Sequence, residues 1–392
     1  MTTNNRLGGL RVEKPGLLFL AMAFALTLAR VLSLVLSDVD LGPDETQYWF
    51  WAQHPDWGYF SKPPLIAWII AATTSVFGDA PWAVRIAAPF LHAGTAGVLY
   101  ALGAIIDSER PIGKSWVGFW AGSIWLTAPG VMLASLIIST DTPLLFFWAV
   151  ALLCFFKLAD PDAPPEHAWR LAILLGAAIG AGMLAKYAAI YFVIGAGLAV
   201  ITTRARIRPI DAAIAVGAAL ALIAPNLLWN AGNGFQTVSH TAANANWSGE
   251  LLNPVALAVF LVGQLAVFGP ITLALLIIAA VQFGKIPPHS SVRPWVRRAL
   301  LAFIAPPIII ISLQSFISRA HANWAAAAFP AAAVLVALWA VRTQRQRWLA
   351  AGVAINLAIG VVGMIASTNF ALIDQSGAGD LIKRVRGWEA QG

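Results

Sequence analysis

The 392-residue chain is 59% hydrophobic and only 11% charged, whereas a soluble globular domain carries roughly 25% charged residues. Long apolar runs recur from Pro15 to Ala366, which excludes a soluble fold and predicts an all-α polytopic membrane protein. The basic residues that give the net charge of +7 lie in short loops between apolar segments, which argues against a nucleic-acid partner. The single cysteine, Cys154, excludes a disulfide framework.

The first apolar run, 15–37, follows three basic residues within positions 1–14. A basic start and an apolar stretch are also the pattern of a cleaved signal peptide. The run is long, and no clear A-x-A site precedes Asp38. We therefore expect an anchor that remains as the first helix, with residues 1–14 as a cytoplasmic N-terminus.

A helix needs about 20 apolar residues to cross a membrane. Cutting the chain at clusters of charge, Pro and Gly predicts about eleven spans: 15–37, 81–106, 115–135, 141–158, 169–185, 187–203, 210–229, 253–283, 299–316, 325–341 and 348–366. The break after 169–185 depends on Lys186 and nearby glycines, and its alternative is one long tilted helix. Gly269 and Pro270 predict a kink or an early end within 253–283.

Loop charge assigns the two sides of the membrane. With the N-terminus in the cytoplasm, 15 of the 25 Lys and Arg residues fall in cytoplasmic loops. Three lie in an outward tail, 367–392, and the other outward loops hold four: Lys62, Arg85, Lys186 and Arg319. We therefore predict a multi-pass protein of the inner (plasma) membrane, with a transmembrane domain over 15–366 and a long first outward loop over 38–80.

The first outward loop opens with an acidic pair. Pro43 followed by Asp44 and Glu45 is typical of the first turn of a helix. We expect 44–53 to be a short amphipathic helix at the membrane interface. The two carboxylates then either complement the helix dipole or serve a site. We favour a functional role for Asp44, and both interpretations stay open for Glu45.

A lysine and two prolines follow in the same loop. Lys62 would project toward the headgroups, where it suits an anionic group. Its alternative is a lysine that only snorkels to the interface. Pro63 and Pro64 fix the direction of the chain just after it, which favours a placed side chain.

Later outward segments supply further polar residues. Asp141 opens an apolar helix, where it either caps the N-terminus or serves a site. Lys186 lies between two apolar helices, where a bare charge is costly, so we expect it to face a cavity or a partner. Arg319 and His321 lie in a short polar hinge, 319–324.

All of these polar side chains map to the outward side. A carboxylate with several cations suits the attack of a hydroxyl group on an anionic, lipid-linked donor. The carboxylate takes the proton from the acceptor, and the cations stabilise the phosphate that leaves. No Walker loop, G-x-G-x-x-G or H-E-x-x-H motif is present, so nucleotide use and zinc proteolysis have no motif support.

The ordered set resembles the GT-C superfamily of membrane glycosyltransferases, most closely its protein O-mannosyltransferase and lipid A aminoarabinose-transferase group. The group shares an Asp-Glu pair with a nearby Tyr, a Lys-Pro-Pro step, an Ala-Val-Arg, an Asp-x-Pro and a helix-ending Lys. In this sequence these elements are Asp44-Glu45, Tyr48, Lys62-Pro63-Pro64, Ala83-Val84-Arg85, Asp141-Thr142-Pro143 and Lys186. The resemblance is clearest over 38–190, and the segment 321–330 is similar to a His-and-aromatic step of bacterial members.

The resemblance implies a GT-C-type bundle of about eleven transmembrane helices, with short interfacial helices in the first outward loop. It also implies inverting transfer from a polyprenyl-phosphate sugar donor, next to membrane lipids, with Asp44, Glu45 and Asp141 as the catalytic carboxylates. The residues that it assigns to the donor and its phosphate are Tyr48, Lys62, Arg85, Lys186, Arg319 and His321.

A divalent metal is left open by the resemblance. Asp141 and His321 are the candidate ligands. Ser61 stands where aminoarabinose transferases carry an acid, which removes a third ligand and weakens the case for a bound metal, so the cofactor stays unspecified. Neither the sugar nor the acceptor, which is an envelope lipid, glycan or protein, is specified.

Two rival functions are compatible with a polytopic chain. A lipid or solute transporter would place ionisable residues near mid-membrane, and Arg30 in the first helix is the main residue expected that deep. The lack of an internal repeat weighs against transporter folds built from related halves. A non-catalytic assembly protein would leave the outward charges unexplained.

Overall fold

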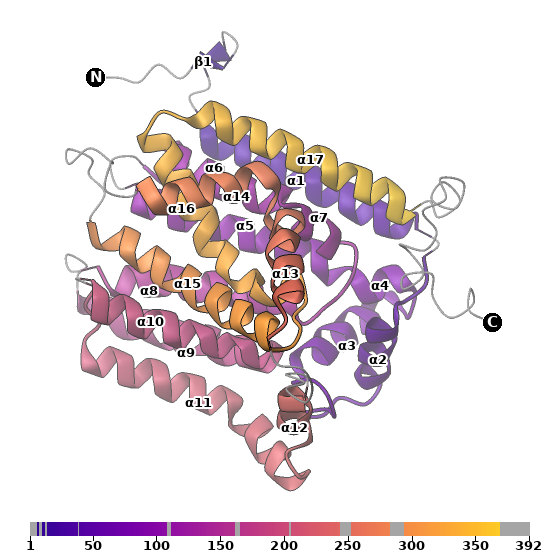
Figure 1. Cartoon of the computed structure of the whole chain (residues 1–392). Coiled ribbons are helices and arrows are strands. Elements are labelled where there is room, and N and C mark those ends of the chain that lie inside the picture. The colour runs from indigo at the N-terminus through magenta and orange to yellow at the C-terminus, as the bar shows by residue number, and fades with distance from the viewer. Residues whose placement is uncertain are drawn as a thin grey trace.

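The computed structural model describes residues 6–7, 10–11, 14–37, 39–107, 111–160, 165–203, 205–243, 252–282 and 294–368. Helices carry this fold (Figure 1). Before them lie two short strands, β1 (Arg6–Leu7) and β2 (Leu10–Arg11), which pair antiparallel. Residues 369–392, which include most of the predicted outward tail, lie outside the described part of the chain.

The helices follow one another closely along both halves of the chain. The first half contains α1 (Pro15–Val35), α2 (Pro43–Ala52), α3 (Leu65–Phe77), α4 (Pro81–Arg85), α5 (Ala87–Ile106), η1 (Ile112–Lys114), α6 (Trp116–Thr127), α7 (Pro129–Ala134), α8 (Asp141–Leu158), η2 (Pro165–His167) and α9 (Ala168–Ala185). The second half contains η3 (Tyr187–Ala189), α10 (Ile190–Thr202), α11 (Pro209–Gly232), α12 (Gln236–Ala243), α13 (Pro254–Phe268), α14 (Pro270–Val281), α15 (Pro294–Ile317), η5 (Ala322–Ala328), α16 (Phe329–Arg342) and α17 (Gln346–Thr368).

Eight helices in the described residues are long and apolar enough to cross a membrane, or nine if the bent pair α13–α14 is one span. The polytopic all-helical class is confirmed, but the predicted count of eleven is not. The expected span 115–135 is divided into α6 and α7, because Pro129 has no N–H with which to continue the first helix. With 13 residues, α10 is about 20 Å long, which is short against a hydrocarbon core of about 30 Å.

The expected interruption at 253–283 is a sharp corner. The axes of α13 and α14 differ by 107°, and Gly269 between them has a left-handed φ of 93°. A Cβ atom at this position would overlap the side chain of Asn356 in α17. The corner therefore requires glycine both for its backbone conformation and for the close approach of α17.

The break between α9 and α10 is confirmed. Lys186 follows the last residue of α9 in an extended conformation, with φ −161° and ψ 130°. The chain then resumes with η3 and α10. The alternative of one long tilted helix is wrong, and Lys186 is the residue at which α9 ends and η3 begins.

The bundle has a central layer and a lipid-facing periphery. The residues of α16 are buried from Phe329 to Ala340, and this helix packs on α6, α15 and α14. By contrast, α1, α11 and α17 expose large apolar side chains along most of their length. Such surfaces are stable only where lipid replaces water, so these helices face the bilayer.

The short helices gather at one end of the bundle. In Figure 1, α2, α3 and α4 lie beside one another at the end where α9 and α15 also terminate. The predicted helix 44–53 is confirmed as α2. Its N-terminus is closed by Glu45, whose carboxylate accepts a hydrogen bond of 2.9 Å from the Gly42 amide.

Candidate functional site

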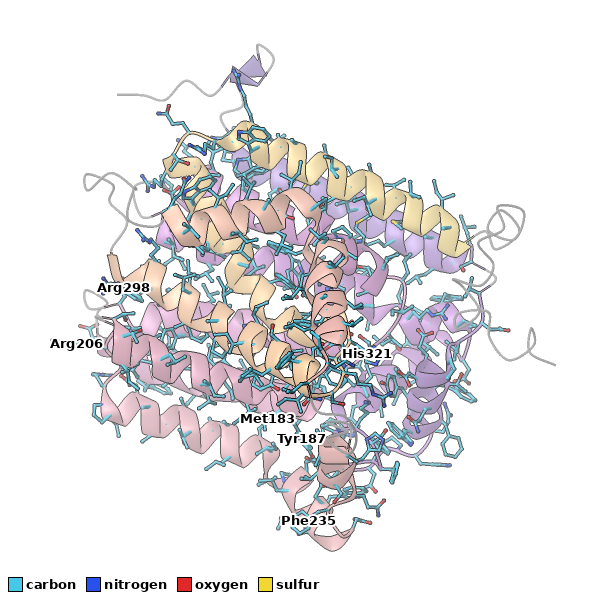
Figure 2. The ribbon with its side chains drawn as sticks, viewed as in Figure 1. Met183, Tyr187, Arg206, Phe235, Arg298 and His321 are labelled. Carbon is cyan, nitrogen blue, oxygen red and sulfur yellow. The ribbon has the colours of Figure 1, made fainter. Side chains whose placement is uncertain are left out.

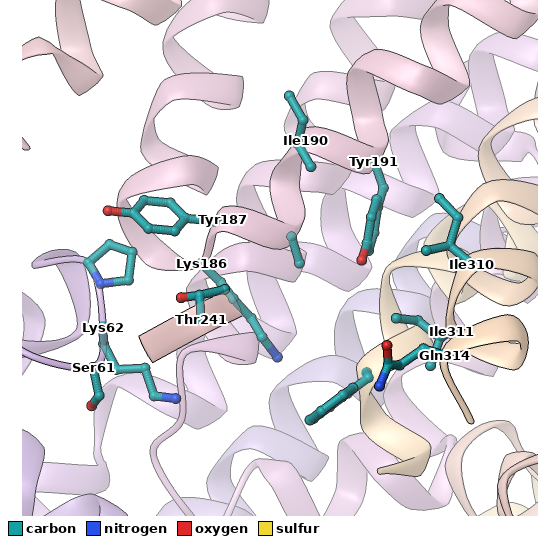
Figure 3. A pocket seen from close by; sticks show the side chains of 13 residues that line it. Ser61, Lys62, Lys186, Tyr187, Ile190, Tyr191, Thr241, Ile310, Ile311 and Gln314 are labelled. Carbon is teal, nitrogen blue, oxygen red and sulfur yellow. The ribbon is translucent and has the colours of Figure 1, made fainter. Parts of the chain in front are cut away.

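A cavity of about 470 Å³ opens at this end of the bundle. One part of its wall carries Ser61, Lys62 and Lys186, and the rest is mainly apolar, with side chains from α10 and α15: Ile190, Tyr191, Ile310 and Ile311. Figure 3 shows the two lysines entering from the α2–α3 loop and from the start of η3, with Ile310 and Ile311 on the far side. The cavity therefore joins a cationic end to an apolar wall.

Lys62 is the cation of the cavity that lacks an ion pair within the described residues. Its side chain is partly buried. Burial, reinforced by the neighbouring charge of Lys186, lowers the pKa of Lys62 below its usual 10.5, while Asp44 and Asp141 oppose this shift. The same influences show that Lys186 and the two carboxylates lie within electrostatic reach of Lys62.

Lys186 is paired with a carboxylate. Its Nζ donates to Asp141 Oδ1 at 2.7 Å, and the second oxygen of Asp141 accepts a hydrogen bond of 2.8 Å from Asn323 Nδ2. The Lys186 and Asp141 side chains are 25% and 14% exposed. Three chain segments, α8, the α9–η3 break and η5, therefore meet at one carboxylate.

Asp44 lies in the first turn of α2, and its side chain is exposed. No hydrogen bond to its carboxylate comes from the part of the chain that the structure describes. One turn later, Tyr48 is buried against the bundle. Its burial, together with the charges of Asp44 and Asp141, raises the pKa of the Tyr48 hydroxyl, so the phenol stays protonated.

Glu45 and Arg85 form a closed, buried pair. Arg85 Nε and Nη2 donate to the two Glu45 oxygens at 2.9 and 2.7 Å, and its Nη1 and Nη2 also bind the carbonyls of Val39 and Asp40. Glu45 Oε1 accepts a further bond of 2.9 Å from the Ile138 amide. Arg85 was expected to contact a donor phosphate, but its guanidinium is enclosed and occupied by these partners.

Arg319 and His321 lie near the cavity without lining it. Both side chains are exposed. The His321 ring packs edge-on against Trp324, with centroids 5.5 Å apart, and Trp324 lines the cavity. In Figure 2, His321 lies at the same end of the bundle as Tyr187, whereas Arg206 and Arg298 lie at the opposite end. The structure thus brings the predicted hinge to the site through Asn323 and Trp324.

No metal centre forms within the described ranges. They contain no group of three or more His, Cys, Asp or Glu side chains placed to hold a metal. Both Asp141 oxygens are bound by nitrogen donors, and the exposed His321 ring packs on Trp324 instead of facing a carboxylate. The donor set around Asp141 is one of cationic and amide N–H groups, which does not fit a divalent cation.

A polar network anchors the loop that carries Lys62. Asn226 donates to the Trp57 carbonyl at 2.7 Å and accepts a bond of 2.8 Å from Tyr187. Trp229 Nε1 donates to Asp56 at 2.7 Å. Gly58 approaches the Trp229 ring so closely that a Cβ atom would overlap it. The α2–α3 loop is therefore fastened to α11, and this fixes the position from which Lys62 extends.

The sequence reasoning missed several of these residues. Asn323 was inside the predicted hinge, but its contact with Asp141 depends on a fold that brings together residues 182 positions apart. Asn226 and Asn230 did leave a signal, because two asparagines spaced i, i+4 in an apolar span mark one polar stripe. That stripe faces Tyr187, whose hydroxyl accepts a bond of 3.1 Å from Asn230.

Comparisons with known proteins identify the family of the chain. Residues 61–229 match the dolichyl-phosphate-mannose-protein mannosyltransferase family. The chain is 35% identical over 343 residues to the lipid A galacturonosyltransferase RgtD of Rhizobium johnstonii, covering 86% of this chain and 68% of that protein.

Solved structures show the same fold. The ArnT structure from Cupriavidus metallidurans bound to undecaprenyl phosphate matches with a TM-score of 0.66 at 18% identity, over 88% of this chain and 64% of that one. Its apo form matches with a TM-score of 0.63 at 17% identity, over 94% and 77%. Together with the sequence relatives, these matches confirm the predicted superfamily: the chain belongs to the GT-C superfamily of membrane glycosyltransferases.

Proposed function

We propose that this glycosyltransferase inverts the anomeric carbon as it moves a sugar from a polyprenyl-phosphate carrier to an envelope glycolipid. The observation that carries the proposal is the cavity with two lysines at one end and an isoleucine-rich wall at the other. A phosphate with an isoprenoid tail needs both surfaces at once. ArnT, which shares the fold, has been crystallised with such a carrier, undecaprenyl phosphate.

We base the proposed sugar and acceptor on the sequence relative RgtD, which is more similar in sequence to this chain than ArnT is. RgtD is a lipid A galacturonosyltransferase, and the 35% identity extends over most of this chain. We therefore assign galacturonic acid as the sugar to test first and a lipid A-type glycolipid as the acceptor.

Asp44 acts as the general base of the proposed reaction. An acceptor hydroxyl attacks the anomeric carbon from the face opposite the phosphate, and the bond between that carbon and the phosphate oxygen breaks. The electron pair leaves with the phosphate, and the proton of the hydroxyl goes to Asp44. An exposed carboxylate within electrostatic reach of Lys62 has the access that this role requires.

The cationic end of the cavity receives the phosphate. Lys62 and Lys186 supply the positive charge that stabilises the leaving group. Because Glu45 and Arg85 are enclosed, we assign them to holding α2 in place, so that Asp44 is presented at a fixed distance from the lysines. Tyr48 remains protonated, but it is buried and is not among the residues that line the cavity.

We place the cavity on the non-cytoplasmic side of the inner membrane, with the N-terminus in the cytoplasm. The support is the charge of the loops, since Arg206 and Arg298 mark the opposite end of the bundle (Figure 2). The domain division over 1–14, 15–366 and 367–392 is part of this proposal.

Arg30 does not support the transporter alternative. It is fully buried, and its Nη2 donates to the Leu126 carbonyl and to Met132 Sδ at 3.0 Å. Leu126 stands at the end of α6, where Pro129 interrupts the helix and leaves carbonyls without partners. Arg30 therefore serves this break and lies away from the cavity lining.

Mass spectrometry of cell-envelope glycolipids, with and without the gene, tests the proposal. The expected result is the loss of one hexuronic acid residue from a lipid A-type species and its return when the gene is restored. An unchanged glycolipid profile, with a sugar lost instead from a protein, would contradict the assigned acceptor.

A further inference from the structure

Two lysines reach the same cavity, but only one of them is neutralised. Lys186 is bound to Asp141 at 2.7 Å, whereas no carboxylate of the described residues forms an ion pair with Lys62. This difference in pairing is unexplained by a simple phosphate-binding site, where both cations would be free. On the basis of the proposed function, we relate the difference in pairing to the change in phosphate charge during the reaction.

The charge on the carrier phosphate changes as the reaction proceeds. A polyprenyl-phosphate sugar is a phosphodiester with one negative charge. When the bond to the sugar breaks, the electron pair stays on the phosphate oxygen, and the product is a phosphomonoester that approaches two negative charges. A cation that engages only the second charge stabilises the transition state more than the ground state, and so raises kcat.

We infer that Lys62 binds the monoanionic donor while Lys186 stays bound to Asp141. As the second negative charge develops on the phosphate, Lys186 leaves Asp141 and binds the phosphate. In the resting site, Lys186 gains little by leaving Asp141 for a phosphodiester. A phosphomonoester carries more charge and draws it away. The step therefore changes only the partner of Lys186.

Asn323 is the positioning residue of this exchange. Its Nδ2 donates to the Asp141 oxygen that Lys186 does not use, at 2.8 Å. When Lys186 turns to the phosphate, this bond continues to stabilise the Asp141 carboxylate and holds it in place. Gln264 in turn donates to the Ala322 carbonyl at 3.2 Å, which fixes the start of η5 that presents Asn323.

The exposures of the pair suit such an exchange. The Lys186 and Asp141 side chains are 25% and 14% exposed, against 3% and 8% for Arg85 and Glu45. Separating a fully desolvated pair is costly, whereas a partly hydrated pair loses far less free energy when it is separated. Lys186 also has a single carboxylate contact, and Nζ has three donors to redirect.

A binding experiment separates the two lysines without requiring turnover. Purified protein in lipid nanodiscs is titrated with undecaprenyl phosphate and with its methyl phosphodiester at pH 8, where the first carries close to two charges and the second one. We expect the wild-type protein to bind the monoester about tenfold more tightly, the scale of one charge-assisted contact.

The variants then assign that preference. Lys62→Met should weaken both ligands by a similar factor, whereas Lys186→Met should remove the preference for the monoester. Asn323→Leu should reduce it to about threefold, because Asp141 then depends more strongly on Lys186. Asn323→Ser, which retains a donor, should restore part of it. Arg298→Gln, which removes a cation at the opposite end of the bundle, is the matched control.

A second variant keeps the test informative if Lys186→Met does not fold. Asp141→Asn frees Lys186 in the resting site, so the phosphodiester should bind more tightly. The preference for the monoester should then fall because the affinity for the phosphodiester rises. A preference that survives both Lys186→Met and Asp141→Asn would overturn the inference. If the wild-type protein bound neither ligand saturably, the proposed carrier, and with it the proposed function, would fail instead.

Discussion

Two ion pairs stand at the same end of the bundle and differ in almost every physical respect. Glu45–Arg85 is buried, and both of its side chains are also bound to backbone groups of other segments. Asp141–Lys186 is partly exposed, borders the cavity and is completed by one side-chain amide. Both consist of motif residues that the sequence analysis assigned to chemistry, yet only the second is free to change partners.

The difference in burial separates a structural ion pair, Glu45–Arg85, which we call the framework, from an ion pair that can contact a ligand, Asp141–Lys186, which we call the reagent. A buried guanidinium with four hydrogen bonds cannot reach a substrate without leaving unpaired polar groups behind. A half-hydrated ammonium group can, because water and ligand replace what it gives up. Asp44 belongs to neither pair: its side chain is exposed and accepts no hydrogen bond from the described residues.

The largest expected effect concerns Asp44. Asp44→Asn should lower the rate of sugar transfer by about 10³-fold, within the usual range for loss of a general base. Because the side chain is exposed, thermal stability in detergent should not change. Transfer rates and melting temperatures, measured on the same preparations, check both parts; a large loss of stability at an unchanged rate would assign Asp44 to the framework.

Breaking each ion pair should affect stability unequally. Arg85→Met leaves Glu45 buried and unpaired, which should cost about 3–5 kcal/mol of unfolding free energy. Lys186→Met should cost less than about 1 kcal/mol, because its pair is partly hydrated. Denaturant titrations of the two variants make the comparison, and equal losses would contradict the division into framework and reagent.

The pH dependence should report Lys62. In the proposed site its protonated form binds the phosphate, and burial together with the charge of Lys186 lowers its pKa below 10.5. Donor affinity should therefore fall as the pH rises through this lowered pKa, earlier than for an exposed lysine. In Lys62→Arg the fall should move to higher pH, because a guanidinium stays charged. Titrations of carrier binding between pH 7 and pH 11 would show it, and identical profiles would exclude Lys62 as the phosphate ligand.

The smallest effect is expected in the loop anchor. Asn226→Ala removes bonds to Trp57 and Tyr187, which should cost about 1–2 kcal/mol of stability. It should raise the KM for the donor severalfold, because Lys62 is then held less firmly, with little change in kcat. Steady-state kinetics separate the two constants; a change in kcat alone would mean that the anchor acts on the chemical step.

Much of the architecture could be predicted from the sequence. Composition and loop charge indicated a polytopic bundle, and the glycines beside Lys186 indicated the break that the structure confirms. The number of spans could not be predicted, since hydropathy does not distinguish a continuous helix from two pieces joined at Ala128 and Pro129. Span length alone also did not reveal the 107° corner after α13.

Motif order indicated which candidate residues lie at one end of the bundle, but not which contacts they make. Motif order placed Asp44, Lys62, Asp141 and Lys186 in one region, and their electrostatic contacts agree with this. It could not show that Arg85 is enclosed, because burial arises from the packing of α2 against α4 and the segment before α8. Nor could it show Asn323 at Asp141, a contact created by the fold of η5 onto α8.

Reconstituted transfer tests the central claim most directly. Wild-type protein and Asp44→Asn in proteoliposomes are supplied with a labelled polyprenyl-phosphate galacturonic acid and a lipid A acceptor. We predict a new glycosidic bond with inverted configuration from the wild-type protein, and transfer about 10³-fold slower from Asp44→Asn, which should still bind undecaprenyl phosphate normally. Full transfer by Asp44→Asn, or movement of the labelled carrier across the bilayer without a new glycosidic bond, would contradict the account.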